Sequence, residues 1–355
     1  MAIMEDLREK IKFLLSVNSA GYAEKIVDMQ YSLSPEYWNK FSASGRELSL
    51  RDAAYHLPFL GEAVVASDKS IFTDYVAWVK VLFRGLNFKD SVMIKTLECT
   101  AEVLKEEFTE DLYIIILPFI EAGIEQMMQD VDEQEAFIDE STEIGKLAKK
   151  YNEALLDGNR NLAGKMIHDA LAKGISIKDI YLEVFQKSQY EIGRLWLSNR
   201  ISVAKEHYCS AATQMIMSQL YQYIFSSERI GRKMVAACVG GELHELGIRM
   251  VADFFEMEGW DTYYLGANSP ATTIIKAAEE NEADMIALSI AMPFHRNLLK
   301  ETISTIRKSN MGKDVKIMIG GTAINKNSNI EGFDADGWAP NALAAVENAN
   351  RLVTN

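Results

Sequence analysis

The sequence has few of the features that cross-link a chain or anchor it in a membrane. Its only cysteines are Cys99, Cys209 and Cys238, and an odd number at such wide spacing fits neither a disulfide framework nor a zinc site. The longest apolar run, residues 112–120, is far shorter than the roughly 20 residues that a membrane span needs. Residues 1–10 carry acidic side chains where a targeting segment would be basic and then apolar. We therefore expect buried, inert thiols and a cytoplasmic protein that does not contact a membrane.

Basic residues are also scarce. The chain has 37 Lys and Arg against 51 Asp and Glu, a formal net charge of -14. Binding to a phosphate backbone depends on clustered positive charge, so the composition excludes nucleic acid as a partner. Residues 101–140 hold thirteen acidic residues and a single basic one, Lys105. This segment is either a set of solvated helix faces or a docking surface.

What remains is typical of a multidomain globular chain: 355 residues, 48% of them hydrophobic and 25% charged, enough for two or three domains. Residues 1–130 show helical periodicity throughout, as on the face formed by Phe72, Tyr75 and Val79, and predict an all-α domain. Residues 143–227 show four helical segments joined by short turns, which predict a four-helix bundle.

From residue 231 to residue 355, short apolar runs alternate strictly with helical segments. Continuous apolar strands with helical crossovers predict a doubly wound, flavodoxin-like α/β domain with a parallel sheet. Ligands of such sheets bind beyond the carboxyl ends of the strands. The expected strands are residues 234–239, 262–265, 285–290 and 316–319, with a weaker one near Trp338.

The loop after the first of these strands reads GGELHELG, residues 240–247. It lacks the GxGxxG spacing of a dinucleotide site. His244 alone is either a surface residue or a metal ligand whose second ring nitrogen is oriented by Glu242 or Glu245. Ser289 ends the third strand, and Gly320 and Gly321 end the fourth, where small residues let a bulky ligand approach the backbone.

Glu-x-His-x-x-Gly, followed by a serine and then Gly-Gly, resembles the signature of cobalamin-binding domains over residues 233–353. The resemblance implies that His244 is the lower axial ligand of cobalt and that Glu242, Leu243 and Gly247 contact the cofactor around it. It implies that Ser289, Gly320 and Gly321 line the slot for the dimethylbenzimidazole tail. The family more often has Asp at the position of Glu242, and Leu or Thr at that of Ala291, and neither difference removes the ligand.

Trp196 is followed, after nine residues, by Glu206 and His207. On one unbroken helix Trp196 and His207 would lie roughly 16 Å apart, but residues 198–202 interrupt the helix, with Ser202 as a plausible N-cap. Taken singly, the Trp suits a core and the Glu-His pair a solvated face. Beside a cobalamin domain, the pattern resembles the upper-face motif of light-sensing cobalamin domains, which implies that these residues enclose the 5′-deoxyadenosyl group of adenosylcobalamin.

One position departs from that motif. Light-dependent cobalamin repressors have a second His directly after the Trp, and this chain has Leu197. A photoproduct with two His ligands from that position is therefore doubtful.

The repressors begin with a basic winged helix-turn-helix, which this chain lacks. Its aromatic-rich segment, residues 31–78, instead resembles the globin-like domain of photoglobins and photocobilins. The resemblance implies a non-covalent biliverdin, since Cys99 has no recognisable attachment context. A bilin needs aromatic walls, a polar group near its pyrrole nitrogens and cations for its propionates. The residues considered are Tyr55, His56, Tyr75 and Trp78 for the walls and the polar group, and Arg46 or Arg51 for the cation. Alternatively, these aromatics form a core and His56 is a satisfied buried imidazole.

The leading hypothesis is a non-enzymatic photoreceptor, a homo-oligomer whose assembly changes with light and which signals to an unknown partner. The alternative is a corrinoid protein that carries a methyl group between partner methyltransferases, which needs an upper face that partners can reach. A mutase is not expected, because its substrate barrel would need several hundred more residues.

Overall fold

The computed structural model describes residues 2–38, 40, 43–130, 135–225, 227–324 and 331–353. Packing divides the chain into two compact units. The first consists of residues 1–134 with 197–200, and the second of residues 135–196 with 201–355.

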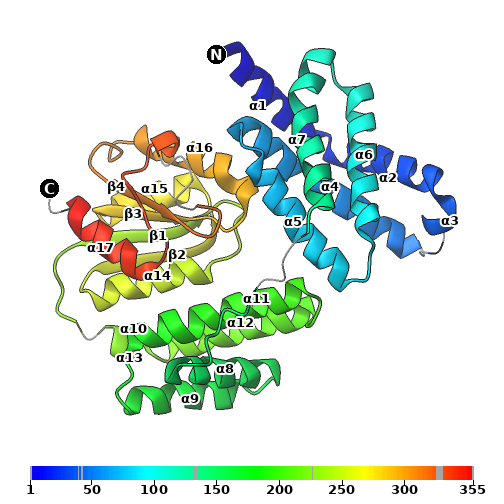
Figure 1. Ribbon diagram of the computed structural model, residues 1–355. Helices are drawn as coiled ribbons and strands as arrows, with labels where there is room; N and C mark the ends of the chain where they lie inside the picture. The colour runs from blue at the N-terminus through cyan, green and yellow to red at the C-terminus, as the bar shows by residue number, and fades with distance from the viewer. Residues whose placement is uncertain are drawn as a thin grey trace. The chain divides into compact units, whose positions relative to one another are not determined.

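The described part of the first unit is entirely helical, which confirms the predicted all-α character (Figure 1). Its globin-like identity stays a prediction. Two of the helices, α4 and α7, continue through an internal proline, Pro58 and Pro118. The helices are α1 (Ala2–Val17), α2 (Ser19–Leu33), α3 (Pro35–Trp38), α4 (Ala43–Ala66), α5 (Ser70–Gly85), α6 (Asp90–Glu107) and α7 (Glu110–Met128).

The second unit begins with the helical bundle. Each of its main helical segments starts at a side chain that accepts a hydrogen bond from a backbone N–H of the first turn, as N-caps do. One predicted helix contains a π-helical stretch, which the 3.6-residue pattern did not indicate. The elements are α8 (Glu143–Leu156), α9 (Arg160–Ala172), α10 (Ile177–Asp179), η1 (Ile180–Gln186), α11 (Lys187–Leu197), α12 (Val203–Ser218) and α13 (Tyr221–Ile224). Of the acidic connector before the bundle, residues 131–134 lie outside the described residues.

The second unit continues as the predicted α/β domain. Its sheet has the order β2-β1-β3-β4-β5 with every pair parallel, the doubly wound order in which ligands bind beside β1 and β3. The strands are β1 (Lys233–Val239), β2 (Asp261–Ser269), β3 (Met285–Ser289), β4 (Lys316–Gly320) and β5 (Gly337–Trp338). The helical elements are α14 (Leu246–Met257), α15 (Ala271–Glu280), η2 (Pro293–His295), α16 (Arg296–Arg307), η3 (Glu331–Phe333) and α17 (Ala342–Val353).

Alternate residues of the central strands enter two different cores. Met234, Ala236 and Cys238 of β1 face α14 and α17, whereas Val235 and Ala237 face α15 and α16. Figure 1 shows the two helix pairs on opposite sides of the sheet. Burial on both faces explains why these strands read as continuous apolar runs.

The bundle and the α/β domain share a core. Buried residues of α8, η1 and α12 belong to the same hydrophobic cluster as those of α14. The Tyr181 hydroxyl, on η1, donates to Asp253 Oδ2 of α14 at 2.7 Å, and both side chains are buried. The bundle and the sheet, expected as separate domains, thus pack as one unit.

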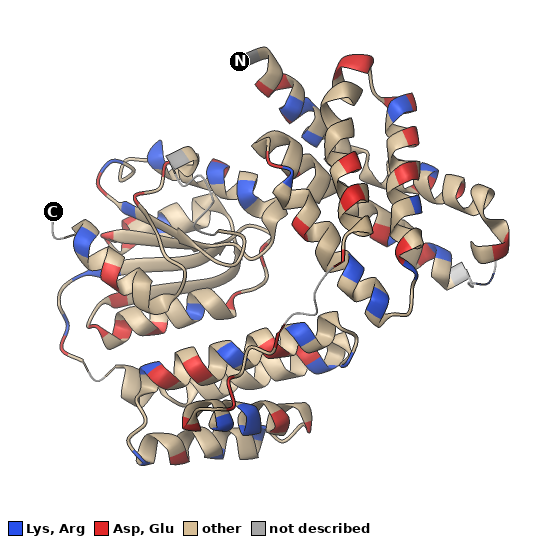
Figure 2. Ribbon diagram, viewed as in Figure 1, with Lys and Arg blue, Asp and Glu red and all other residues tan. Residues whose placement is uncertain are grey.

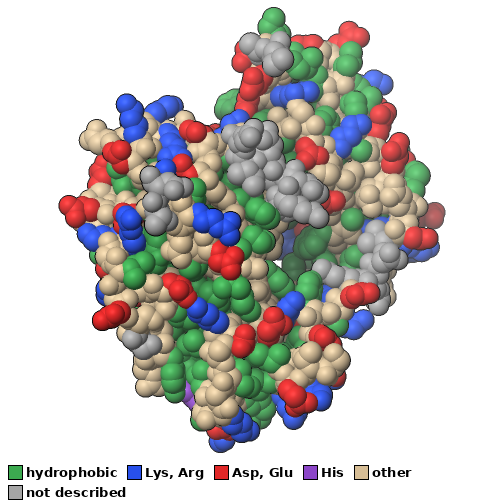
Figure 3. Space-filling model, turned by 60° about the vertical axis from the view of Figure 1, so that its left-hand side comes forward, with side chains coloured by type: hydrophobic (Ala, Val, Ile, Leu, Met, Phe, Trp, Pro, Cys, Tyr) green, Lys and Arg blue, Asp and Glu red, His purple; other side chains and the backbone are tan. Residues whose placement is uncertain are grey.

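Charge is distributed as the sequence indicates. Figure 2 marks acidic residues along α6 and α7, with few basic residues between them. On the face drawn in Figure 3, charges of both signs are mixed with exposed hydrophobic side chains. None of the helices in the described part of the chain combines the length and hydropathy of a membrane span.

Candidate functional site

His244 stands at the carboxyl edge of the sheet, in the loop between β1 and α14. Its Nδ1 lies 2.6 Å from Glu242 Oε1, and its backbone N–H donates to the same oxygen at 3.0 Å. The His244 side chain is 63% exposed, whereas that of Glu242 is fully buried. Nε2 of His244 has no hydrogen-bond partner among the described residues. The ring is therefore held at one nitrogen and open at the other.

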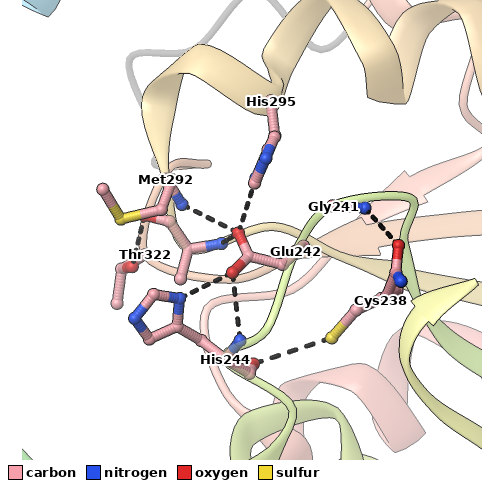
Figure 4. Close-up of polar contacts among 9 residues, drawn as sticks. Cys238, Gly241, Glu242, His244, Met292, His295 and Thr322 are labelled. Carbon is pink, nitrogen blue, oxygen red and sulfur yellow. Dashed lines mark hydrogen bonds and ion pairs between the residues drawn. The ribbon is translucent and has the colours of Figure 1, made fainter. Parts of the chain in front are cut away.

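Glu242 organises the loops around it (Figure 4). Its Oε2 accepts from the backbone N–H groups of Ala291 and Met292, at 2.7 and 3.0 Å, and lies 3.0 Å from His295 Nδ1. One carboxylate thus joins the loop after β1 to the loop after β3. His295 was not predicted, because a lone His on a short 3-10 turn carries no signal without the fold.

These contacts shift the pKa values of the pair in opposite directions. Burial alone would raise the pKa of Glu242, but hydrogen bonds from His244, His295 and backbone N–H groups outweigh it and hold that pKa well below its usual range. The hydrogen bond to Glu242 raises the pKa of His244 against the effect of burial, and the charge of Glu206 contributes in the same direction. Glu242 is therefore ionised, and its Oε1 accepts a hydrogen bond from Nδ1–H of His244.

Other predicted residues surround this centre. Ser289 pairs in register with Gly320, so the ends of β3 and β4 meet as expected. Gly321 has φ +98°, and a Cβ there would lie 2.1 Å from the Ile290 carbonyl oxygen, so only glycine fits. Leu243 is 70% exposed beside His244, and Gly247 lies in the first turn of α14.

The bundle contributes α12 to the neighbourhood of His244. Ser202 caps this helix by accepting from the Lys205 N–H at 3.3 Å, and Glu206 and His207 follow within the first turns. His207 Nδ1 bonds Glu206, and the charge of Glu206 acts on His244. Trp196 is half-buried near the end of α11. Enclosure of a ligand by all three residues stays a prediction.

Comparison with known families agrees with this geometry. Residues 232–347 match the family model described as B12 binding domain, and residues 147–221 match a second model of the same description. The first match covers the loop of His244 and the ends of β3 and β4, and the second covers most of the bundle. The chain is a cobalamin-binding protein.

The similar proteins are corrinoid proteins. A corrinoid protein of Desulfitobacterium hafniense is 23% identical over 214 residues, 59% of this chain and 99% of that protein. A dimethylamine corrinoid protein of Methanosarcina acetivorans is 28% identical over 120 residues, 34% of this chain and 55% of the relative. The structure of the Methanosarcina barkeri monomethylamine corrinoid protein aligns with a TM-score of 0.52 at 20% identity, covering 58% of this chain and 98% of that one, and shows the shared fold.

The cobalamin-binding site fits its cofactor on structural grounds as well. A cobalt ligand needs a neutral imidazole nitrogen, with the other nitrogen donating to a fixed acceptor. His244 meets this requirement through Glu242. The glycine at position 321 lets the loops after β3 and β4 pack closely beside the site.

In the first unit of this cobalamin-binding protein, the predicted bilin residues come together around Tyr75. Its hydroxyl lies 2.6 Å from His56 Nδ1, and its ring centroid lies 6.4 Å from that of Tyr55 and 6.1 Å from that of Trp78. Phe59, which the sequence did not single out, stacks on Tyr75 with centroids 3.6 Å apart. Such a stack leaves no room for a second planar group between the two rings.

The polar residues of this cluster are partnered. His56 is buried, and desolvation lowers its pKa to about 4, so it is neutral. Arg46 pairs with Asp28, and Arg51 pairs with Asp52. Burial raises the pKa of the Cys99 thiol to about 11, which disfavours the thiolate that covalent attachment would need.

Proposed function

We propose that this protein holds cobalamin through His244 and acts as a corrinoid carrier, passing a methyl group between partner methyltransferases without being an enzyme itself. The observation that carries the proposal is the fixed and outward-facing imidazole of His244. The names of the similar proteins, which are corrinoid proteins, support the carrier function. Bound cobalamin would supply the cobalt that takes up a methyl group and releases it again.

The protein's part in this chemistry is to orient the ligand. By accepting a hydrogen bond from Nδ1–H, Glu242 fixes the tautomer in which the Nε2 lone pair of His244 is free. The backbone N–H groups of Ala291 and Met292 keep the carboxylate in place, so the imidazole does not have to be ordered when the cofactor enters. This preorganisation raises affinity for the form of cobalamin whose own base has left the metal.

Replacement of the ligand tests the proposal. The apoprotein is loaded with methylcobalamin, and its absorption spectrum and Kd are compared with those of His244→Ala and of His168→Ala, a half-buried histidine of α9. We expect the wild type and His168→Ala to give the same spectrum, and His244→Ala to lose the imidazole-bound form. An unchanged spectrum in His244→Ala would refute the assignment.

A second candidate function is a light sensor that uses adenosylcobalamin. It is favoured by the proximity of Glu206 to His244 and by the helical unit of residues 1–134, which lies outside both family matches. In this function Trp196, Glu206 and His207 enclose the adenosyl group, and its loss on illumination changes the conformation or the assembly of a homo-oligomer that signals to a partner.

Two forms of the cofactor discriminate between these functions. The protein is loaded in the dark with methylcobalamin or with adenosylcobalamin, and its Kd and oligomeric mass are measured before and after illumination. A carrier binds methylcobalamin at least as tightly as adenosylcobalamin, and its oligomeric mass does not change in the light. A sensor prefers adenosylcobalamin, and its mass changes when that form is photolysed.

The sensor candidate includes biliverdin bound non-covalently to the first unit. Because Phe59 and Tyr75 are already stacked, the bilin would lie against the exposed side of the cluster, where Tyr55 is 43% exposed. Adding biliverdin to the apoprotein tests this assignment. A red-shifted bound spectrum that Tyr55→Ala weakens supports it, and the absence of any bound spectrum contradicts it.

A further inference from the structure

The loop that carries His244 is tied to β2 as well as to β3. The backbone N–H of Gly241 donates to Asn268 Oδ1 at 2.7 Å, and the backbone N–H of Asn268 donates to the Glu242 carbonyl oxygen at 2.9 Å. Asn268 is therefore hydrogen-bonded to Gly241 through its side chain and to Glu242 through its backbone.

An irregular end of β2 puts Asn268 in this position. Against β1, the pairing of β2 shifts once between Ala236 and Ala237 and again between Ala237 and Val239. Each shift adds one residue on β2, as in a β-bulge, and bends the strand end. Asn268 also has φ +51°, a left-handed conformation that Asn adopts more readily than most residues.

The two sides of Glu242 are thus held by different strands. The loop after β3 binds its carboxylate through Ala291 and Met292, whereas Asn268 binds its backbone from β2. The carboxylate can fix the His244 ring only if the backbone that carries it is itself fixed. Asn268 is the one side chain of β2 for which the structure gives a hydrogen bond to residues 240–244, within the described part of the chain.

We propose that Asn268 is a positioning residue for the cobalt ligand, acting through Gly241 and Glu242 rather than by touching the cofactor. The proposal rests on the proposed ligation by His244. It predicts that loss of the Asn268 side-chain oxygen loosens the loop and lowers the fraction of bound cobalamin ligated by the imidazole.

Three substitutions separate the side-chain bond from the backbone conformation. Asn268→Gly keeps the left-handed conformation and removes the oxygen, Asn268→Asp keeps both, and Asn268→Ala loses both. For Asn268→Gly we expect a Kd for cobalamin about two- to tenfold higher, the usual effect of one hydrogen bond. Asn268→Asp should bind as the wild type does, and Asn268→Ala should be the weakest.

A second readout uses the apoprotein. Amide hydrogen exchange of residues 241–244 should be faster in Asn268→Gly and unchanged in Asn268→Asp, while the amides of β1 keep their protection and show that the domain is folded. Wild-type exchange and Kd in Asn268→Gly, or equal losses in Asn268→Asp and Asn268→Gly, would overturn the proposal. If wild-type protein shows no imidazole-bound cobalamin, ligation by His244 fails, and the exchange measurement still decides whether Asn268 holds the loop.

Discussion

Glu242 combines full burial with a negative charge, and its surroundings explain how it keeps that charge. Two imidazoles and three backbone N–H groups surround its two oxygens. A buried carboxylate with so many donors is stable as an anion, whereas one left unpaired would take up a proton. The orientation and the pKa of His244 therefore depend on a buried neighbour.

The substitution Glu242→Gln tests this dependence. It removes the charge and puts an amide NH2 beside the N–H groups that now donate to the carboxylate. The pKa of His244 should therefore fall toward its usual value. The Kd for cobalamin should rise about ten- to a hundredfold. An NMR titration of the apoprotein and a cobalamin titration measure the two effects. Glu282→Gln, whose side chain is 85% exposed at the other end of the sheet, is the control. Equal Kd values for the two variants would contradict the role of Glu242.

The sequence predicts part of this centre and misses part of it. His244, Glu242 and Ser289 lie at or just after the ends of apolar strands, so the carboxyl-edge rule is enough to bring them together. His295 and Asn268 contact the same loop from η2 and from the bent end of β2. Their positions depend on tertiary packing and on strand irregularities, which leave no periodic pattern in the sequence.

At the scale of elements, the first turns of α12 carry Glu206 and His207, which the sensor candidate places around the adenosyl group. Ser202 caps this helix and is followed by Glu206 and His207. The break at residues 198–202 and the cap are readable from the sequence because Ser has a well-defined role at N-caps. The π-helical stretch at residues 180–186 has no such signal, since its sequence is an ordinary amphipathic one.

The cap can be tested by substitution. Ser202→Ala should lower the free energy of unfolding by about 1 kcal/mol. If Glu206 and His207 contact the adenosyl group, fraying of the first turn should weaken the binding of adenosylcobalamin more than the binding of methylcobalamin. Ser202→Asp keeps a capping oxygen and should retain both properties. Urea denaturation and cobalamin titrations provide the measurements, and equal losses for the two cofactors would contradict an adenosyl contact.

The contact between η1 and α14 predicts a pH dependence. Burial raises the pKa of Asp253 from 3.8 to about 6, although Tyr181 and Arg249 oppose the shift. Between these pH values the unfolded chain has released the proton and the folded chain has kept it, so the free energy of unfolding falls as pH rises from about 4 to about 6, by about 3 kcal/mol.

Asp253→Asn isolates this contribution. It retains an oxygen that accepts from the Tyr181 hydroxyl but has no proton to release, so its free energy of unfolding should decline less than that of the wild type across the same pH range. Denaturant unfolding at several pH values measures the difference. Parallel profiles for the two proteins would show that Asp253 does not titrate in this way.

At the scale of the whole molecule, the division into two units has a thermodynamic consequence. Both family matches fall within residues 135–355, whereas residues 1–134 pack into a unit of their own. Because the bundle and the sheet share a core, we expect them to unfold together.

Calorimetry of the full chain tests this division. We expect two transitions, and only one of them should shift to higher temperature when cobalamin is added. At a free cobalamin concentration of a hundred times the Kd, binding should raise the free energy of unfolding of that unit by about 2.7 kcal/mol. A single transition that moves as a whole would show that the two units are coupled.

The central claim is that the His244 imidazole is bound to cobalt, and electron paramagnetic resonance of the protein loaded with cob(II)alamin tests it directly. Protein labelled with 15N is combined with unlabelled cofactor, so the nitrogen beneath cobalt reveals its origin by its nuclear spin. If His244 is the ligand, each cobalt line is split into a doublet by 15N, and the doublet disappears in His244→Ala. A triplet from 14N in the labelled protein would mean that the cofactor's own base remains on cobalt, and would contradict the account.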